Sequence, residues 1–268
     1  MQIIDGKKLS KEILAKVKNE VAFLPFVPVF CDVLVGEDPS SLQYVKMKAK
    51  TAESVGIKFQ NANFPASIST ENLTKEIKTL NKIKNMCGII VQLPLPAHLD
   101  QEAILNVIDP KLDVDCLGRI GNNLFFPTAL ACLAVLESLN LDLNDKKMVV
   151  LGQGMLVGKP VTALLKSKGF LPIAVTSGTK NKEEIIKQAD VIISGIGQGK
   201  YITGDMIKTG AVLIDAGTSE LESSLVGDVD LESVKDVASY VSPVPGGVGP
   251  VTVAMLLNNV LKVAKMRK

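Results

Sequence analysis

The chain has 268 residues, 47% of them hydrophobic and 4% aromatic, and its 30 basic residues nearly balance its 28 acidic ones. This composition predicts a globular chain with apolar residues enough for two domains, taking roughly 150 residues per domain. Because it contains no basic block and no basic stripe interleaved with aromatics, the sequence argues against a nucleic-acid partner.

The N-terminus and the cysteines predict the compartment. The first residues, Met1–Lys8, lack the apolar core of a signal peptide, and no apolar run is long enough to span a bilayer. The cysteines are widely spaced and form no C-x-x-C pair, so neither a zinc site nor a disulfide framework is predicted. We therefore expect a cytoplasmic protein with no membrane partner and no bound metal, in which most cysteines are core residues.

The single histidine, His98, limits the chemistry of any enzyme with this sequence. With one histidine and no cysteine cluster, a histidine-rich metal site or a Ser-His triad is disfavoured. His98 itself follows Pro94 and Pro96 in a loop, where a histidine is more often solvated or capping. An acid–base group would then be a lysine, aspartate, glutamate or tyrosine.

Helical and strand-like segments alternate through the first half of the chain. The second of its helices has clear boundaries, because Asp38 can cap it, Pro39 suits its first turn and Gly56 can end it. The expected strands are Val27–Val35, Ile57–Phe64 and Cys87–Leu93, and the expected helices are Leu9–Phe23, Pro39–Val55 and Thr70–Ile83.

The alternation continues in the second half, after a helix near Thr128–Leu139 that joins the two halves. Its order is typical of a doubly wound, nucleotide-binding sheet. A C-terminal helix, Val251–Lys265, would return to the first domain. The expected strands are Lys147–Leu151, Leu171–Val175, Val191–Ser194 and Val212–Asp215, with helices near Lys159–Lys168 and Lys182–Gln188.

This alternation predicts an α/β protein with two α/β domains, the second a Rossmann-like doubly wound parallel sheet. We place the first domain at residues 1–117, completed by the C-terminal helix at 250–268. The second domain then covers residues 118–249.

A glycine-rich loop, Gly152-Gln-Gly-Met-Leu-Val-Gly158, follows the strand that ends at Leu151 and precedes a helix. Glycines permit a tight turn and let backbone N–H groups approach a phosphate, which the N-terminus of the helix then favours electrostatically. Such a loop alone is a weak signal. The strand before it, the helix after it and the βα units that follow favour a dinucleotide site over an ordinary turn.

Tyr44 and Lys48 are four residues apart on the predicted second helix and therefore share a face. A desolvated lysine can lose its proton near neutral pH and act as a base. Spacing alone favours another interpretation, in which Lys46, Lys48 and Lys50 form a solvated stripe.

Two further segments of the first half carry polar groups. Gln92-Leu-Pro-Leu-Pro96 ends a buried strand, at the position where α/β sheets place ligands. In Asp113-Val-Asp115, alternation would point the two carboxylates the same way. Taken alone, each segment is better explained by a structural role than by a role in binding or catalysis.

The segment Pro243–Thr252 combines three glycines with three prolines, ahead of an apolar helical pattern. Prolines restrict the backbone while glycines permit close approaches. Such a segment makes a rigid wall with few side chains at a helix N-terminus, suited to a flat or anionic ligand.

Together these segments resemble the FolD family of bifunctional methylenetetrahydrofolate dehydrogenase/methenyltetrahydrofolate cyclohydrolases, over nearly the whole chain. Because the matches fall on ligand-site motifs in both halves, they carry more than a shared fold would. The matching motifs are Gly36-Glu-Asp-Pro-Ser-Ser41, Tyr44-Val-Lys-Met-Lys48, Val91-Gln-Leu-Pro-Leu-Pro96, Asp113-Val-Asp115, Val157-Gly-Lys-Pro160, Thr203-Gly-Asp205, Val226-Gly-Asp-Val-Asp230 and Pro243–Thr252.

The resemblance implies an enzyme of one-carbon metabolism and purine biosynthesis. It would oxidise 5,10-methylenetetrahydrofolate to the 5,10-methenyl form with a nicotinamide cofactor, then hydrolyse the product to 10-formyltetrahydrofolate. The site would lie in a cleft between the two domains. The partners implied are tetrahydrofolate derivatives and a second copy of the chain, as a homodimer.

The resemblance also implies roles for residues of the folate site. Lys48 would be the general acid/base of the hydrolytic step, and Gln92 would orient Lys48 through a hydrogen bond. Tyr44 would pack against the folate, and Asp115 would accept hydrogen bonds from the pterin edge. The other implied substrate-binding residues are Leu93, Pro94, Pro245, Gly246, Gly247 and Pro250.

For the cofactor, the resemblance implies that the glycine loop cradles the pyrophosphate, with Ser177 near the adenosine ribose and Gly197 near the nicotinamide half. We expect NADP, with NAD as the alternative, because no acid follows the strand that ends at Val175, where an NAD-selective site often has one. The implied cofactor-binding residues are Gly152, Gln153, Gly154, Val157, Gly158, Ser177, Thr179, Gly197 and Thr218.

The sequence departs from the family pattern in two regions. The family commonly carries Gly-Arg-Ser and Cys-His-Ser where this chain has Gly152–Gly154 and Val175–Ser177, so two polar partners for cofactor phosphate and ribose are missing. The segment Cys116–Phe126 is several residues shorter than usual, and the usual Pro-Cys-Thr-Pro is replaced by Phe126–Ala129. Both changes bear on the efficiency of the two activities.

Three alternatives remain open at this point. The chain could be a monofunctional dehydrogenase, an amino-acid or shikimate-type dehydrogenase with the same two-domain plan, or a non-catalytic folate- or nucleotide-binding protein. The presence of Lys48, Gln92 and Asp115 together favours an enzyme with both activities. The segments Gln92–Pro96 and Pro243–Thr252 favour folate as the substrate.

Overall fold

The chain folds into two compact units in the computed structural model, which describes residues 1–118, 124–221 and 224–267. Met1–Lys11 and Thr128–Met255 form one unit, here called the second-half unit. Glu12–Pro127 and Leu256–Lys268 form the other, here called the first-half unit. Each unit is built around its own parallel sheet.

The sheet of the first-half unit has the strand order β3-β2-β4. The central strand β2 (Val29–Val35) pairs in parallel with β3 (Lys58–Phe64) and with β4 (Met86–Val91). Every residue of β2 and β4 is buried, as parallel strands covered on both faces require. The three strands begin and end within two residues of their predicted bounds.

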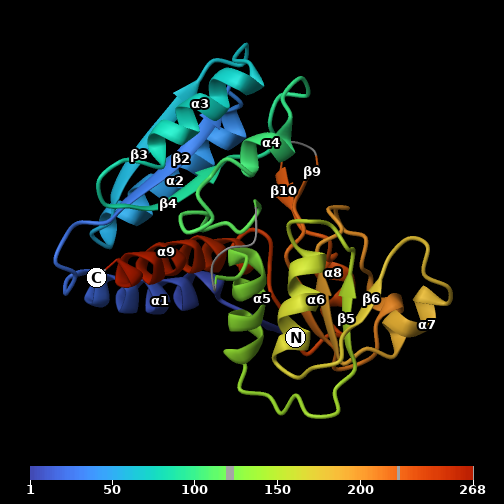
Figure 1. Ribbon diagram of the computed structural model, residues 1–268. Helices are drawn as coiled ribbons and strands as arrows, with labels where there is room; N and C mark the ends of the chain where they lie inside the picture. Colours follow the sequence, from blue (N-terminus) through green and yellow to red (C-terminus); the bar gives the residue numbers. More distant parts are fainter. Residues whose placement is uncertain (119–123, 222–223, 268) are drawn as a thin grey trace. The chain divides into compact units, whose positions relative to one another are not determined.

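Helices α2 (Pro39–Ser54) and α3 (Thr70–Leu80) lie on opposite faces of this sheet (Figure 1). The reason is topological: β3 lies on one side of β2 and β4 on the other, so two right-handed crossovers run in opposite directions. A short helix, α4 (Gln101–Leu105), packs beside α3. The predicted cap of α2 is confirmed, since Asp38 accepts a hydrogen bond from Ser41 N at 2.8 Å.

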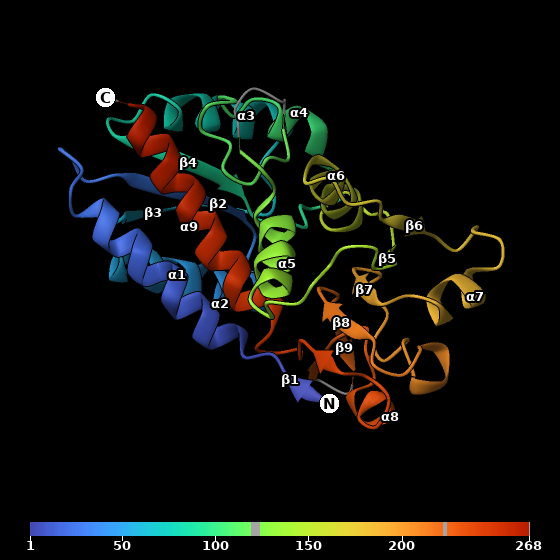
Figure 2. The ribbon, with the colours of Figure 1, turned by 90° about the horizontal axis from the view of Figure 1, so that it is seen from below.

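Helices α1 (Gly6–Val21) and α9 (Val248–Met266) run side by side (Figure 2) and are joined by an ion pair between Lys265 and Glu20. Both begin in the second-half unit and end in the first-half unit. The C-terminal part of α9, including Leu257 and Leu261, belongs to the first-half core, which confirms the predicted return of this helix. No helix in the described ranges is both long and apolar enough to cross a bilayer.

The sheet of the second-half unit has the strand order β1-β11-β8-β7-β5-β6, and all of its described pairings are parallel. Its centre is buried and apolar, as the predicted strands required. The strands are β1 (Gln2–Ile3), β5 (Met148–Leu151), β6 (Ile173–Val175), β7 (Val191–Ser194), β8 (Val212–Asp215) and β11 (Tyr240–Val241).

Short elements complete this unit, and several of them were not predicted. Elements of two to four residues leave no periodic signal in the sequence, which explains why β1, β9, β10, β11 and α8 were missed. The connecting elements are α5 (Pro127–Glu137), α6 (Gly158–Ser167), α7 (Lys182–Lys187), a 3₁₀ turn (Gly204–Met206), the antiparallel pair β9 (Ser219–Leu221) and β10 (Ser224–Val226), and α8 (Leu231–Val234).

The two units differ from the predicted domains, 1–117 with 250–268 and 118–249, chiefly at the N-terminus. Gln2 and Ile3 pair in parallel with Tyr240 and Val241, and this pairing ties the first eleven residues to the second-half sheet. The division also passes through α9 after Met255 rather than before the helix.

Candidate functional site

Lys48 is buried, with 1% of its surface exposed, whereas Lys46 and Lys50 on the same helix are exposed. The solvated-stripe interpretation of Lys48 is therefore wrong. Lys48 shares its face of α2 with Val45 and Ala52, which are also buried. That face is turned toward the sheet, so helical geometry separates Lys48 from its two neighbours.

Lys48 Nζ meets groups from three different elements. It donates to Gln92 Oε1, just after β4, at 2.8 Å, and it forms an ion pair with Asp32 Oδ2 of β2 at 2.6 Å. It also lies 4.8 Å from the centroid of the Tyr44 ring. Gln92 Nε2 donates to Leu93 O at 2.8 Å, which keeps the amide oxygen directed at the lysine. The hydrogen bond expected between Gln92 and Lys48 is present.

Asp115 lies within electrostatic reach of this cluster. Its segment extends along β4, because Ile89 N donates to Leu112 O at 2.8 Å and Ile89 forms a parallel bridge with Asp113. Burial, followed by repulsion from Asp113, raises the pKa of Asp115 to about 7, while Lys48 opposes the shift. Burial, followed by Asp115 and Asp32, raises the pKa of Tyr44. The fold thus brings Gln92 and Asp115 to Tyr44 and Lys48 of α2, from which both are distant in the sequence.

Asp113 has a structural role beside this cluster. Its Oδ1 accepts from Asp115 N at 3.2 Å and Cys116 N at 2.9 Å, and its Oδ2 accepts from Gly118 N at 2.8 Å. These bonds hold the turn that follows Asp115. The shortened segment Cys116–Phe126 starts at this turn, and its residues 119–123 lie outside the described ranges.

Asn259 of α9 is a buried residue that the sequence analysis missed. Its Nδ2 donates to Val114 O at 3.0 Å and to Phe125 O at 2.9 Å, so it fixes the backbone on both sides of the turn. The signal that could have found it is an asparagine inside an apolar helical run, since a buried amide needs hydrogen-bond partners.

Asp115→Asn is expected to remove a pH dependence of stability. The pKa of the folded carboxyl, about 7, lies above its ordinary value of 3.8. Between these values the folded chain holds a proton that the unfolded chain has released, so the folded state loses stability as the pH rises toward about 7. One pKa unit corresponds to about 1.4 kcal/mol. In urea unfolding, the variant should gain at least about 1.4 kcal/mol over the wild type between pH 5 and pH 8. Parallel pH profiles for the two proteins would contradict this.

In the second-half unit, the predicted cofactor residues follow the carboxyl ends of adjacent parallel strands. The loop Gly152–Gly158 follows β5, Ser177 follows β6, Gly197 follows β7 and Thr218 follows β8. The strand order reverses at β5, which has β6 on one side and β7 on the other. Ligands of doubly wound sheets bind at this switch point, so the fold brings these residues to one edge.

The glycine loop is packed too closely for side chains at two positions. Gly152 has a φ of +81°, and a Cβ there would lie 2.9 Å from Gly195 O. A Cβ on Gly158 would overlap Gly152 O. Among the described residues no side chain caps the N-terminus of α6, which leaves that end suited to an anion.

Gln153 is folded back onto its own unit. Its Nε2 donates to Gly152 O at 2.8 Å and to Thr162 Oγ1 at 3.1 Å. The turn after β6 is held by Thr176 N, which donates to Thr179 Oγ1 at 2.9 Å and leaves Ser177 exposed. The loop therefore presents backbone and hydroxyl groups, without the arginine common in the family.

Asp228 is the buried carboxylate that holds the loop carrying Gly197. It is 0% exposed and accepts from Ser194 Oγ at 2.6 Å, Ile196 N at 2.8 Å and Gln198 N at 2.9 Å. The sequence analysis included Asp228 in a family motif but assigned it no role. A carboxylate suits this position because it only accepts hydrogen bonds, and the loop offers it several donors.

The segment Pro243–Thr252 rests on the start of α1. Gly247 N donates to Pro243 O at 2.7 Å, and Ser10 Oγ donates to Pro250 O at 2.8 Å. Helix α9 begins at Val248, three residues earlier than predicted, with Pro250 in its first turn. The predicted substrate residues Pro245, Gly246, Gly247 and Pro250 thus belong to the second-half unit.

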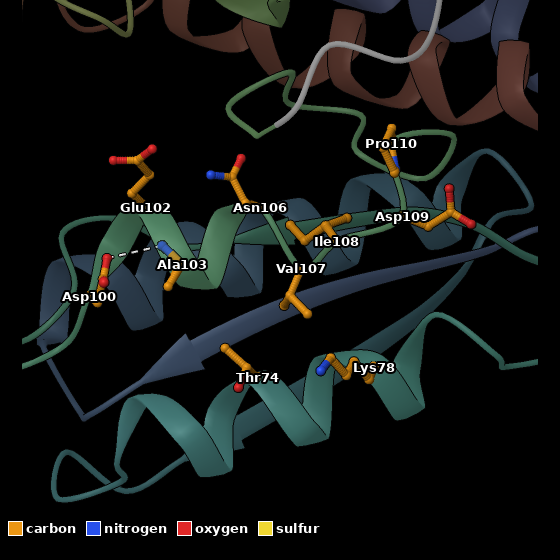
Figure 3. A pocket seen from close by; sticks show the side chains of 10 residues that line it. All are labelled: Thr74, Lys78, Asp100, Glu102, Ala103, Asn106, Val107, Ile108, Asp109 and Pro110. Carbon is orange, nitrogen blue, oxygen red and sulfur yellow. Dashed lines mark hydrogen bonds between the residues drawn. The ribbon is translucent and has the colours of Figure 1, made fainter.

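A surface hollow of about 730 Å³ lies between α3 and α4, but it contains no residue of the Lys48 cluster (Figure 3). Its carboxylates serve local structure: Asp100 caps α4 through Ala103 N at 3.0 Å, and Asp109 accepts from Lys111 N at 2.9 Å. The lining residues are Thr74, Lys78, Asp100, Glu102, Ala103, Asn106, Val107, Ile108, Asp109 and Pro110.

His98 is exposed, with Nε2 3.0 Å from Ile68 O, as expected for a histidine that ties a loop. In the part of the chain that the structure describes, no three His, Cys, Asp or Glu side chains are grouped so that they could hold a metal ion.

Comparison with known proteins agrees with this geometry. The model of the tetrahydrofolate dehydrogenase/cyclohydrolase catalytic domain matches residues 4–115, and that of the NAD(P)-binding domain of the same family matches residues 127–268. The chain is 43% identical over 280 residues to the bifunctional protein FolD of a Nitratiruptor species, with 100% of this chain and 99% of the relative covered.

Solved structures of FolD enzymes have the same fold as this chain. The bifunctional FolD enzyme of Campylobacter jejuni is 37% identical with a TM-score of 0.95, and each chain is covered to 100%. The Trypanosoma brucei enzyme, solved with NADP cofactor and inhibitor, is 34% identical with a TM-score of 0.93, covering 99% of this chain and 98% of its own. These matches leave no support for the shikimate-type alternative. The chain belongs to the tetrahydrofolate dehydrogenase/cyclohydrolase family.

Proposed function

We propose that the protein oxidises 5,10-methylenetetrahydrofolate to 5,10-methenyltetrahydrofolate with NADP and hydrolyses the product to 10-formyltetrahydrofolate. The observation that carries this proposal is the buried Lys48, held by Gln92 and close to the ring of Tyr44. Burying a lysine side chain costs free energy, and buried charged groups of this kind cluster at functional sites. In this family, such chemistry serves the hydrolytic step.

In that step, water adds to the methenyl carbon, and Lys48 accepts the proton that the water loses. The hydroxyl formed in this way then releases its remaining proton to solvent as the bond from this carbon to N5 breaks, and N5 receives the proton that Lys48 accepted, which leaves the formyl group on N10. Tyr44 would pack against the folate, and Asp115 would accept hydrogen bonds from the pterin edge. Leu93 and Pro94, next to Gln92, would line the same site, and by the family resemblance Pro245, Gly246, Gly247 and Pro250 would also bind the substrate.

The second-half unit would bind the cofactor, which when bound supplies the hydride acceptor. The fit rests on the tight turn of the loop, since side chains at Gly152 and Gly158 would collide with neighbouring backbone. Backbone N–H groups of Gly152–Gly158 and the uncapped end of α6 would hold the pyrophosphate. Ser177 and Thr179 would lie near the ribose, and Gly197 and Thr218 near the nicotinamide half.

We favour NADP over NAD because the turn after β6, Thr176–Lys180, offers hydroxyls and a lysine but no acid. A carboxylate there would bind the ribose 2′-hydroxyl of NAD and repel a 2′-phosphate. The Trypanosoma brucei relative, solved with NADP, supports the same choice.

Gln153→Arg should tighten NADP binding and leave NAD binding nearly unchanged. A charge-assisted hydrogen bond to the 2′-phosphate is worth about 1.5–3 kcal/mol, or roughly tenfold to a hundredfold in affinity. Titration calorimetry with both cofactors measures this. Gln153→Met is the control, since it also loses the bond to Thr162 but adds no charge. An equal gain for NAD, or a gain in the methionine variant, would show that the 2′-phosphate is not the target.

Gln92→Ala should slow hydrolysis of methenyltetrahydrofolate by roughly tenfold to a hundredfold, because Lys48 loses a hydrogen bond worth about 1.5–3 kcal/mol. Hydride transfer should change less, since it does not use the acid–base group. Initial rates of both reactions on the same preparation give the comparison. A hydrolysis rate equal to that of the wild type would remove Gln92 from the mechanism.

The function itself is tested by two assays. Reduction of NADP and NAD during oxidation of methylenetetrahydrofolate measures the dehydrogenase, and hydrolysis of methenyltetrahydrofolate without any nicotinamide measures the cyclohydrolase. Hydride transfer without hydrolysis would identify a monofunctional dehydrogenase. Cofactor binding without turnover would identify a binding protein.

We also propose a homodimer in the cytoplasm. The dimer rests on the family resemblance, and the compartment rests on the free cysteines Cys31, Cys87, Cys116 and Cys132. Sedimentation velocity at micromolar concentration distinguishes a dimer from a monomer.

A further inference from the structure

Asp32 is a carboxylate in the middle of the central strand β2, where every residue is buried and Asp32 itself is 0% exposed. Its strand is paired on both edges, so backbone and solvent offer its side chain nothing. Phe30 and Leu34, on the same face of the strand, are apolar. A carboxylate in such surroundings is strongly unfavourable unless it is paired, so packing alone does not explain it.

The charged partner of Asp32 in the described residues is Lys48, with Nζ 2.6 Å from Oδ2 and side-chain exposures of 2% and 0% for the lysine and the aspartate. Among those residues, neither carboxylate oxygen of Asp32 meets the geometry of a hydrogen bond, so its contact with Lys48 is the ion pair. Burial raises the pKa of Asp32, and Lys48 opposes that shift through its charge. Lys48 is therefore the charged group that Asp32 contacts directly.

The arrangement restricts how Lys48 can exchange a proton. An ammonium has three N–H bonds in tetrahedral directions; Gln92 accepts one of them, and the ion pair with Asp32 draws a second toward Oδ2. One direction remains. If the amine is neutral, its two N–H bonds can still satisfy both acceptors, and the lone pair takes the remaining direction. The two acceptors thus determine where a base at this position would act.

We propose that Asp32 is a positioning residue for the hydrolytic step, which holds Lys48 Nζ and places a negative charge beside it. This inference rests on the proposed function. The other groups facing Lys48 are Tyr44 from the same helix, Gln92 after β4 and Asp115 from the segment beside β4. Asp115 is the second acid among them, and it titrates near neutrality, whereas Asp32 is the one in direct contact.

The test is the pH–rate profile of methenyltetrahydrofolate hydrolysis, corrected for the uncatalysed rate, in the wild type, Asp32→Asn and Asp32→Val. A carboxylate next to a cation favours the charged form by about 1–3 pH units. Without it, the limb of the profile that reports Lys48 should move to lower pH by about one unit or more. The limb moves in the same direction whether Lys48 acts as a base or as an acid. In both cases, loss of the carboxylate destabilises the ammonium form of Lys48.

The variants are chosen so that a folding defect does not hide the result. Asn keeps the shape of Asp without its charge, and Val matches the β-branched neighbours of the strand and carries no polar atom of its own. Cys31→Ala is the control, because Cys31 is buried in the same strand but faces the other side. Its profile should keep the wild-type limb even if its stability falls.

In both Asp32 variants, the hydrolysis rate could fall by the same factor at every pH while the limb stays in place. That result would show that Asp32 is only structural. A wild type that does not hydrolyse methenyltetrahydrofolate would instead refute the proposed function. The two failures are therefore distinguishable. A shifted limb in Cys31→Ala would also overturn the assignment, since it would show that any change in β2 moves the profile.

Discussion

Replacing Lys48 with methionine is expected to lower hydrolysis of methenyltetrahydrofolate by about 10²–10⁴-fold, the usual contribution of a general acid–base group. Lys48 is the cation at the centre of the described cluster, and His98 lies exposed on a loop where it binds a backbone carbonyl. NADP binding should be largely unchanged, because the proposed cofactor residues lie in the other unit. Initial rates and cofactor titration on one preparation measure both effects.

This variant has a second effect that its controls must separate. Methionine leaves Asp32 buried without its partner, and breaking a buried ion pair costs about 3–5 kcal/mol. Circular dichroism during urea unfolding should therefore be recorded beside the rates. Lys50→Met is the matched control, since Lys50 is exposed on the same helix. If hydrolysis in a folded Lys48→Met protein falls by less than about threefold, Lys48 is not the general acid–base group.

Adding one methyl group at Gly158 is expected to abolish NADP binding and hydride transfer while hydrolysis continues. In Gly158→Ala the new Cβ would overlap Gly152 O, which is backbone and cannot rotate away. The loop between β5 and α6 must then open, at a cost of about 1–3 kcal/mol for overpacking. The backbone N–H groups that would hold the pyrophosphate move with it. Calorimetric titration with NADP and the dehydrogenase assay report the loss.

Gly154→Ala gives the matched comparison, because a Cβ at Gly154 has nothing within 4 Å among the described residues. Its unfolding midpoint should equal that of the wild type, whereas Gly158→Ala should unfold at lower urea. Any loss of NADP binding in Gly154→Ala would then come from the ligand rather than from the fold. Wild-type stability and NADP affinity in Gly158→Ala would contradict the packing argument.

The sequence by itself determined the class of the fold and the edges of its main elements. Mainly apolar runs at Val27–Val35, interrupted by Asp32, and at Val212–Asp215 predicted buried parallel strands, and both are observed within two residues. Asp38 and Pro39 located the start of α2 for a local reason, since a cap depends on residues three positions away. The glycine loop after β5 was predicted from its own seven residues, although Gly152 also packs against Gly195 O, which follows β7.

Only the tertiary structure decided which residues act together. Lys48 reads as one of three alternating lysines, and its burial depends on Gln92, 44 residues away, and on Asp32 in another element. The pairing of β1 with β11 joins the two ends of the chain through two residues each, too few to produce a pattern. Contacts of this kind depend on the packing of elements far apart in the sequence, and no local periodicity records them. Secondary structure follows from neighbours along the chain, whereas the charge environment of Lys48 exists only once β2, α2 and β4 have packed together.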